Sequence, residues 1–292
     1  NDGVTDVCPD KYGGSRIRGR RFSLIQGAGA QPWRVRKVVW RARSPSSPGR
    51  RAAWACEYAK RLAEARAAVA IGDKLDCTAT LADIEAAGGR GLATELDVAD
   101  MASATNLAAR ALDAFGRIDI LVNNAGGWRP KATLDTTEDE FEACFRFNVT
   151  TAFAMTRLAV PKMVETAGSG AIVNISSVAG RFNARGFVAY GTAKSALSFL
   201  TQNLAQDFAP KIRVNGIAVG SILTEALAGF RNEDLERQML SKTPMNRIGS
   251  VEDIAACALY LASPAASYVT GEVYGVNGGL TQIQVEMPPA DL

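Results

Sequence analysis

Short apolar runs alternate with longer segments of helical periodicity along most of the chain. The predicted strands span residues 37–40, 67–72, 91–96, 118–122, 171–175, 212–218 and 272–276. The predicted helices span residues 51–65, 75–87, 101–115, 137–165 (interrupted near Pro161), 190–208, 225–242 and 251–261. This alternation implies parallel βαβ units. We therefore expect an α/β fold with a doubly wound parallel sheet of Rossmann type and three α/β/α layers, forming a single domain over residues 37–292.

The composition limits the class of protein. With 292 residues, 47% hydrophobic and 22% charged, the chain has an ordinary composition for one large soluble domain. The net charge of +3 is too small to indicate nucleic-acid binding, and no apolar run is long enough to span a bilayer. Five scattered cysteines without a CxxC motif indicate free thiols in a reducing compartment. We expect a cytoplasmic protein that binds neither nucleic acid nor membrane.

The chain contains no histidine. This excludes a Ser-His-Asp triad, a histidine-ligated metal and a histidine general base. Proton transfer must therefore depend on Tyr, Lys, Asp, Glu or Cys, and we predict no metal site.

Tyr190 and Lys194 are four residues apart, which on a helix places both side chains on one face. A neighbouring ammonium favours the phenolate, so we expect Lys194 to lower the pKa of Tyr190 below about 10. Ser177 follows the apolar run 171–175, thirteen residues before Tyr190. Taken alone, the Tyr-Lys pair is more typical of a surface helix.

Polar residues stand at the ends of several predicted strands. In a doubly wound sheet, ligands bind at the carboxyl ends of the strands, so Asp73, Asp97, Asn124 and Ser177 should face one crevice. A carboxylate at Asp73 can accept both hydroxyls of an adenosine ribose and would repel a 2′-phosphate, which favours NAD over NADP. The adjacent Lys74 weakens this inference, and a helix cap is the simpler interpretation of Asp73 alone.

Residues 59–282 resemble the short-chain dehydrogenase/reductase family. The matching segments are Asp97-Val98, Asn123-Asn124-Ala125-Gly126, Phe147-Asn148-Val149, Ser177 with Tyr190 and Lys194, Arg213-Val214-Asn215 and Ile222-Leu223-Thr224. The segments occur in the family's order, each at the predicted strand end or helix where the family has it.

The resemblance implies an NAD(P)-dependent enzyme that interconverts a secondary alcohol and a ketone. It implies the catalytic residues Asn148, Ser177, Tyr190 and Lys194. In these roles Tyr190 is the acid/base, Ser177 binds the substrate oxygen, Lys194 holds the nicotinamide ribose and Asn148 holds a water. The implied cofactor-binding residues are Asp73, Asp97, Val98, Asn124, Ala125, Gly126, Tyr190, Lys194, Ile222 and Thr224.

The C-terminal third is most similar to bacterial hydroxysteroid dehydrogenases of this family, which makes a hydroxysteroid one candidate substrate. A 3-oxoacyl carrier-protein reductase or a general carbonyl reductase is the alternative. Residues 222–241 should cover the substrate. Gly229, Phe230, Met239, Phe182, Asn183 and Phe187 are candidate lining residues, with core packing the simpler role for Met239. The helices that begin near Thr137 and Tyr190 resemble the family's subunit-pairing helices, which implies a homotetramer or homodimer.

Two segments depart from the family pattern. The glycine-rich turn expected at residues 48–55 reads Pro-Gly-Arg-Arg-Ala-Ala-Trp-Ala, although glycine lets a backbone approach a pyrophosphate. Val219-Gly220 replaces the usual Pro-Gly. The altered turn keeps a second class of function open, that of a non-enzymatic dinucleotide sensor or scaffold.

Residues 1–36 form an anomalous basic segment. Between Lys11 and Cys56 there are twelve Lys and Arg and no Asp or Glu. An out-of-frame or disordered stretch is our preferred interpretation. An Arg-rich targeting segment and a nucleic-acid-binding arm are the alternatives.

Overall fold

The computed structural model describes residues 37–41, 53–74, 76–97, 100–223, 233–285 and 287–288. For residues 37–41, 53–56 and 101 it describes the backbone alone. The predictions for residues 1–36, for most of the turn at 48–55 and for Val98, Thr224, Gly229 and Phe230 therefore lie outside the described residues.

Seven parallel strands form one sheet in the order β3-β2-β1-β4-β5-β6-β7. The strands are β1 (Lys37–Arg41), β2 (Ala68–Asp73), β3 (Arg90–Glu95), β4 (Ile120–Asn123), β5 (Gly170–Ser177), β6 (Ile212–Val219) and β7 (Val273–Val276). The order reverses between β1 and β4, and ligands of such sheets bind at this switch point. The predicted doubly wound fold is confirmed.

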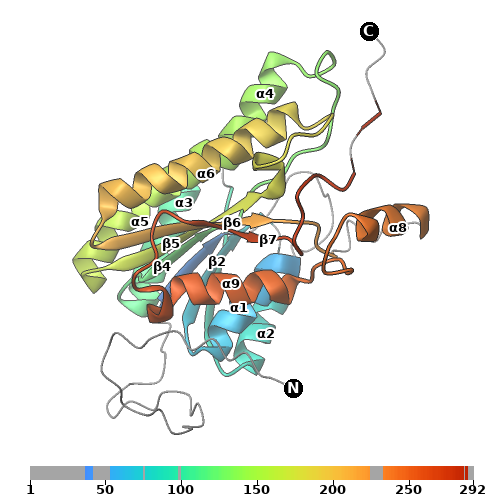
Figure 1. Cartoon of the computed structure of the whole chain (residues 1–292). Helices are drawn as coiled ribbons and strands as arrows, with labels where there is room; N and C mark the ends of the chain where they lie inside the picture. The colour runs from blue at the N-terminus through green and yellow to red at the C-terminus, as the bar shows by residue number, and fades with distance from the viewer. Residues whose placement is uncertain are drawn as a thin grey trace, which may run out of the picture. The chain divides into compact units, whose positions relative to one another are not determined.

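Helices cover both faces of the sheet (Figure 1). On one face lie α1 (Ala53–Glu64), α2 (Thr78–Ala86) and α9 (Val251–Ala262); on the other lie α3 (Met101–Phe115), α5 (Thr151–Ala167) and α6 (Val188–Phe208). Successive strand residues point to opposite faces, so Val173 joins the core under α1 and α9 while its neighbour Ile172 joins the core under α3, α5 and α6. The strands are mainly apolar on both faces, as expected of a sheet whose two faces are both covered.

The sequence prediction was wrong about where the long helix 137–165 is interrupted. The break is not at Pro161, which lies inside α5. Instead α4 (Glu138–Phe145) passes into a π-helical turn, η1 (Arg146–Thr150), before α5 begins. Proline removes one backbone donor, which α5 accommodates, whereas the wide π turn changes the direction of its side chains. The turn carries Asn148, so the irregularity lies at the candidate site.

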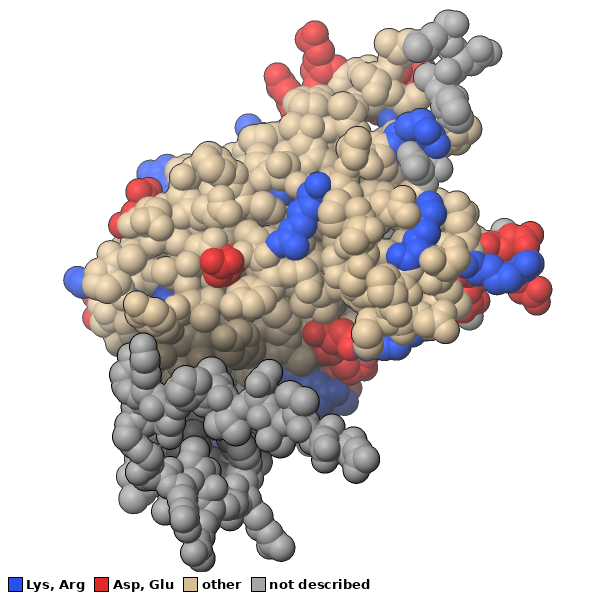
Figure 2. All heavy atoms as spheres, viewed as in Figure 1, with Lys and Arg blue, Asp and Glu red and all other residues tan. Residues whose placement is uncertain are grey.

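Other boundaries differ by a few residues, each for a local reason. The backbone N–H of Thr78 donates to Asp76 Oδ1 at 3.0 Å, and this turn makes α2 begin at Thr78 rather than at residue 75. Thr137 caps α4 through a capping box with Glu140, which fixes the predicted start. In the segment 225–242, the described helix is α8 (Glu233–Ser241), and acidic side chains gather over it (Figure 2).

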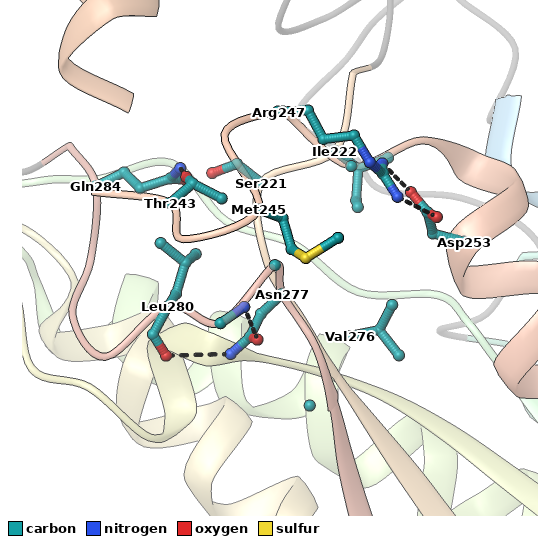
Figure 3. Close-up of a pocket in the computed structure, with 14 residues that line it drawn as sticks. Ser221, Ile222, Thr243, Met245, Arg247, Asp253, Val276, Asn277, Leu280 and Gln284 are labelled. Atoms are coloured by element: carbon teal, nitrogen blue, oxygen red, sulfur yellow. Dashed lines mark hydrogen bonds and ion pairs between the residues drawn. The ribbon is translucent and has the colours of Figure 1, made fainter. Parts of the chain in front are cut away.

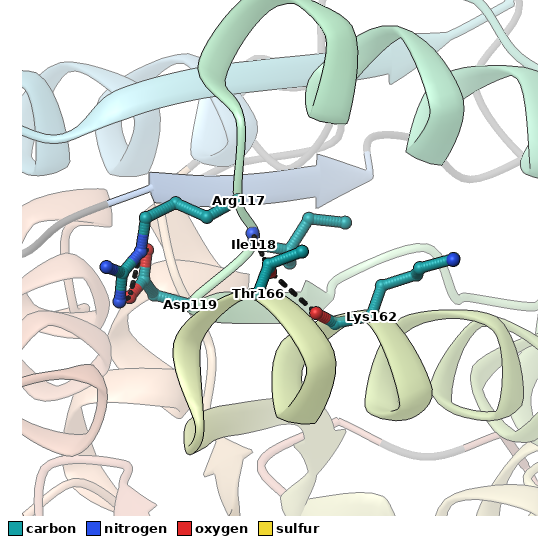
Figure 4. A network of polar contacts seen from close by, with 5 residues as sticks. All are labelled: Arg117, Ile118, Asp119, Lys162 and Thr166. Carbon is teal, nitrogen blue, oxygen red and sulfur yellow. Dashed lines mark hydrogen bonds and ion pairs between the residues drawn. The ribbon is translucent and has the colours of Figure 1, made fainter.

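A polar cluster stabilises the opposite end of the sheet, where β4 begins (Figure 4). Arg117 forms an ion pair with Asp119, and the Thr166 hydroxyl on α5 donates to Lys162 O at 2.6 Å. The same hydroxyl accepts from the Ile118 N–H at 3.3 Å. The cluster ties the loop before β4 to the end of α5, so the end of the sheet away from the site is fixed.

In the described part of the chain, no helix is long and apolar enough to cross a membrane.

Three buried side chains join β4, β5 and α6 below the candidate site. Asn123 Nδ2 donates to Asn174 Oδ1 at 2.9 Å, and Asn174 Nδ2 donates to Thr201 Oγ1 at 2.9 Å. All three residues are at most 2% exposed. Buried polar groups need such partners, so the chain fixes the height of α6 against the two strands.

Replacing Thr201 by Val should lower the free energy of unfolding by about 1–3 kcal/mol, because the buried Asn174 amide loses its acceptor. Chemical denaturation followed by circular dichroism measures the change. The same replacement at the exposed Thr133 is the control and should be nearly neutral. Equal stability of the two variants would contradict a structural role for the network.

Candidate active site

The candidate active site lies where β4 and β5 end and α6 begins. Ser177 is the last residue of β5, and Gly126 follows β4. Tyr190 and Lys194 stand one turn apart near the start of α6, and Asn148 lies in the π turn. The structure thus brings together the four predicted catalytic residues from three separate segments.

Lys194 is buried, with 2% of its surface exposed. Its Nζ donates to the main-chain carbonyl of Ile175 at 2.8 Å and lies 5.7 Å from the centre of the Tyr190 ring. The β5 backbone therefore fixes the end of this long side chain. Sequence analysis did not find Ile175, because a main-chain carbonyl leaves no signal in residue type.

Asn148 is fully buried and contacts the strand-end loop after β4. Its Oδ1 accepts from the Gly127 N–H at 2.8 Å, and its Nδ2 donates to the carbonyls of Gly127 at 3.2 Å and Cys144 at 2.9 Å. The π turn aims the amide at this loop. Asn148 therefore holds Gly126-Gly127 in place beside Lys194.

Gly126 is required by close packing. A Cβ at this position would lie 2.5 Å from Lys194 Nζ and 2.8 Å from Asn148 Oδ1. Such distances are below any normal contact between heavy atoms. The glycine of the predicted Asn-Asn-Ala-Gly turn thus leaves room for the amine and the amide together.

Ser177 lies close enough to Tyr190 for its side chain to lower the pKa of the Tyr190 phenol. Ser177 Oγ also accepts from the Ala179 N–H at 3.2 Å, which caps the short helix Val178–Gly180. Of the predicted substrate-side residues, Phe187 lies near Tyr190, with ring centres 6.4 Å apart. Phe182 is partly exposed and Asn183 exposed.

The prediction that Lys194 lowers the pKa of Tyr190 is wrong. Burial raises the pKa of Tyr190 to about 12; the hydrogen bond with Ser177 opposes this shift and the nearby Cys144 adds to it. Burial also lowers the pKa of Lys194 to about 7. Loss of hydration disfavours both charged forms, and this outweighs the attraction between them. Sequence reasoning considered the neighbouring charge but not the burial.

Cys144 is a second residue that sequence analysis missed. It is fully buried one turn before Asn148, and its carbonyl accepts from the Asn148 amide. Burial raises the pKa of its thiol to about 11, so it is neutral at physiological pH. Its position in the helix pattern alone gave no sign of this contact.

Asp73 and Asp97 lie at the far end of the same sheet edge. Asp73 ends β2 and is 5% exposed, while Asp97 forms an ion pair with Lys74 at 2.6 Å. The order β2-β1-β4-β5 separates Asp73 from Ser177 by three strand spacings, about 14 Å. A buried carboxylate at one end and a buried amine at the other fit the two riboses of a dinucleotide.

The remaining predicted site residues divide into three groups. Asn124 and Ala125 precede Gly126 at the end of β4, and Ala125 is 6% exposed. Ile222 lies beyond β6 and is 5% exposed. Met239 is 1% exposed, which agrees with core packing. The predicted role of the altered turn at 48–55 in cofactor binding stays a prediction. Of these residues the structure describes only the backbone of 53–55, at the start of α1.

Known proteins resemble this chain over most of its length. A family model described as enoyl-(acyl carrier protein) reductase matches residues 52–281. A 7α-hydroxysteroid dehydrogenase of Escherichia coli K12 is 39% identical over 229 residues, 77% of this chain and 89% of that protein. An uncharacterised oxidoreductase of Mycobacterium tuberculosis is 46% identical over 242 residues, 82% of this chain and 91% of that protein.

Solved structures agree with these relatives. A 7α-hydroxysteroid dehydrogenase complexed with NADH and 7-oxo glycochenodeoxycholic acid has a TM-score of 0.78 and 34% identity, over 86% of this chain and 98% of that one. A hydroxysteroid dehydrogenase from Escherichia coli has a TM-score of 0.72 and 34% identity, over 84% and 96% of the two chains. The predicted resemblance to hydroxysteroid dehydrogenases is confirmed. The chain belongs to the short-chain dehydrogenase/reductase family, whose members use NAD(P), and it is an oxidoreductase that acts on CH–OH groups.

Proposed function

We propose that this protein interconverts a secondary alcohol and a ketone with NAD, using Tyr190, Lys194, Ser177 and Asn148. A hydroxysteroid is the candidate substrate, because relatives named hydroxysteroid dehydrogenases match most of the chain. The observation that carries the proposal is the position of the buried Lys194 amine, which donates to the Ile175 carbonyl at 2.8 Å and lies 5.7 Å from the centre of the Tyr190 ring. A general carbonyl reductase or 3-oxoacyl carrier-protein reductase would use the same arrangement.

In this proposal Ser177 and Tyr190 both bind the reacting oxygen of the substrate. Tyr190 gives a proton to the carbonyl oxygen during reduction and takes it from the hydroxyl during oxidation. Bound NAD supplies the chemistry of hydride transfer. Because the pKa of Tyr190 is raised to about 12, the neutral phenol is ready to act as the acid. Oxidation needs the phenolate and should therefore accelerate with rising pH.

Lys194 and Asn148 position the groups around the reacting atoms, and Lys194 can also exchange a proton. The Lys194 amine would bind the ribose next to the nicotinamide, and its lowered pKa of about 7 lets it exchange a proton near neutrality. Asn148 holds the Gly126-Gly127 loop against this amine. Asp73 would accept the hydroxyls of the other ribose. Lys74 is engaged by Asp97, which supports NAD over NADP since a 2′-phosphate would have to compete for it.

The proposal extends to a homodimer or homotetramer located in the cytoplasm. Aromatic side chains are exposed on the helices predicted to pair subunits, with Phe199 on α6 65% and Phe153 on α5 41% exposed. Burying such side chains against a second copy is favourable, which supports the predicted dimer or tetramer. We also propose the cytoplasm as the location, on the basis of cysteine usage.

Replacing Tyr190 by Phe should lower kcat by about a hundred- to ten-thousandfold, because the acid/base is lost while the ring stays. NADH formation from steroid secondary alcohols, followed by absorbance, measures the effect. The fully exposed Tyr268 offers a matched control, and its replacement by Phe should leave kcat unchanged. Full activity of the Tyr190 variant would refute the assignment.

Replacing Asp73 by Ser should reduce the preference for NAD over NADP, measured as a ratio of kcat/KM values, by about tenfold or more. The physical reason is loss of the carboxylate that accepts ribose hydroxyls and repels the 2′-phosphate. Asp113, exposed on α3, provides the control replacement. An unchanged ratio would remove Asp73 from the cofactor site.

Replacing Lys194 by Met should change how stability depends on pH. The pKa of Lys194 falls from 10.5 to about 7 on burial, so between these values the unfolded chain binds a proton that the folded chain does not. This group therefore makes the free energy of unfolding rise as pH rises above about 7. The variant should lack that contribution.

Urea unfolding of both proteins at pH 7, 8 and 9 measures this slope. The free energy of unfolding of the Lys194 variant, relative to that of the wild type, should be highest at pH 7 and should fall toward pH 9. A Met replacement of the exposed Lys162 should keep the wild-type slope. If the Lys194 and Lys162 variants behave alike, the amine is not deprotonated in the folded protein.

A further inference from the structure

Ser176 is a buried serine that the proposed mechanism does not use. It is 3% exposed and lies in β5 between Ile175 and Ser177. Its hydroxyl reaches across to α6 and donates to the main-chain carbonyl of Lys194 at 2.9 Å. The strand therefore contacts the backbone of the helix at the residue whose side chain carries the amine of the candidate site.

Ser198 contacts the same carbonyl from within the helix. It lies one turn after Lys194 on α6, and its hydroxyl donates to the Lys194 carbonyl at 3.0 Å. The oxygens of Ser176 and Ser198 are 2.8 Å apart, so either hydroxyl can also donate to the other. A bond from a serine to the carbonyl four residues earlier stays inside its own helix. Of these two serines, only Ser176 therefore joins the carbonyl to the strand.

Consecutive residues of β5 hold Lys194 at both of its ends. The side-chain Nζ donates to the Ile175 carbonyl at 2.8 Å, and the main-chain carbonyl accepts from the Ser176 hydroxyl. Neighbouring residues of a strand keep a fixed spacing of about 3.3 Å along its axis. The two points of attachment therefore cannot move apart unless the strand deforms, which leaves this long side chain little freedom.

Close backbone packing strengthens the same junction. The short helix Val178–Gly180 follows β5 directly. A Cβ on Gly180 would lie 2.6 Å from the carbonyl carbon of Lys194 and 2.9 Å from its oxygen. Backbones approach this closely only where glycine leaves room. The end of β5 and the start of α6 therefore meet at the Lys194 carbonyl from two directions.

We propose that Ser176 is a positioning residue, which fixes Lys194, and through α6 also Tyr190, relative to Ser177. Because Ser176 is buried, it acts through Lys194 and not by contact with a substrate. Its consequence for catalysis rests on the proposed function. The fixed position of the amine follows from the contacts alone.

Replacing Ser176 by Ala should lower kcat for alcohol oxidation about tenfold or more, because a displacement of about 1 Å near the reacting atoms can cost about a hundredfold. The KM for the alcohol should change less than about twofold, since Ser176 has no contact with it. Absorbance of NADH measures both parameters. Ser198→Ala is the matched control and should keep kcat within about twofold, because the Ser176 hydroxyl can still donate to the Lys194 carbonyl.

A conservative replacement covers the case in which Ser176→Ala does not fold. Cysteine is close to serine in volume and is a weak donor, so kcat of Ser176→Cys should fall between those of wild type and Ser176→Ala. Wild-type kcat in Ser176→Cys and Ser176→Ala would overturn the proposal. An equal loss of kcat in Ser176→Ala and Ser198→Ala would do the same, because it would indicate an effect on the fold alone.

A second readout does not depend on activity. The pKa of Lys194, which burial lowers to about 7, can be followed by the NMR shift of its isotope-labelled Cε, assigned with Lys194→Met. In the described chain Tyr190 on α6 and Cys144 on α4 are the titratable groups that face the amine, and the replacements keep both. An amine that leaves its buried position regains hydration. Ser176→Ala should therefore raise its proton affinity about tenfold or more, and Ser198→Ala should not.

The two readouts separate failure of this inference from failure of the proposed function. If wild-type protein oxidises no secondary alcohol with NAD, but the Lys194 titration shifts in Ser176→Ala alone, the proposed reaction fails and the positioning role stands. If alcohols are oxidised, and neither kcat nor the titration distinguishes Ser176→Ala from Ser198→Ala, the positioning role fails alone.

Discussion

The burial of the Lys194 amine is the constraint on which the site depends. An ammonium loses much of its hydration when it is enclosed, and here it has one main-chain carbonyl, that of Ile175, at 2.8 Å. Burial lowers the pKa of the amine to about 7. The space that the amine occupies is available because residue 126 is a glycine. Burial also raises the pKa of the neighbouring Tyr190 phenol. Loss of hydration therefore works against the charged form of both groups.

The parallel sheet explains why distant segments meet here. All strands end at one edge, so a polar residue at the end of each strand faces the same crevice. The strand interiors are mainly apolar on both faces, and the predicted catalytic and cofactor-binding residues of β2 and β5 lie at the strand ends. The network of Asn123, Asn174 and Thr201 then sets the position of α6, and with it the position of Tyr190, relative to the strand ends.

The sequence was sufficient to predict those features that follow from the spacing of residues along the chain. The strand-helix alternation predicted the doubly wound sheet, and the spacing of Tyr190 and Lys194 predicted their shared helix face. It failed where the outcome depends on environment. The direction of the Tyr190 pKa shift follows from burial, which no local pattern reports. The sequence likewise showed no sign of the π turn at Asn148, because α and π turns use the same residue types and differ only in whether an N–H bonds to the carbonyl four or five residues back.

The Arg247–Asp253 ion pair connects α9 to the segment that follows α8 (Figure 3). Asp253 also accepts from the Ser250 N–H at 2.8 Å and so caps α9, which packs on the sheet. Arg247 is thereby tied to this helix, and the segment 243–249 is fixed with it. The chain from α9 through Asp253 and Arg247 therefore fixes the segment that follows α8 on the side of the sheet covered by α1 and α9.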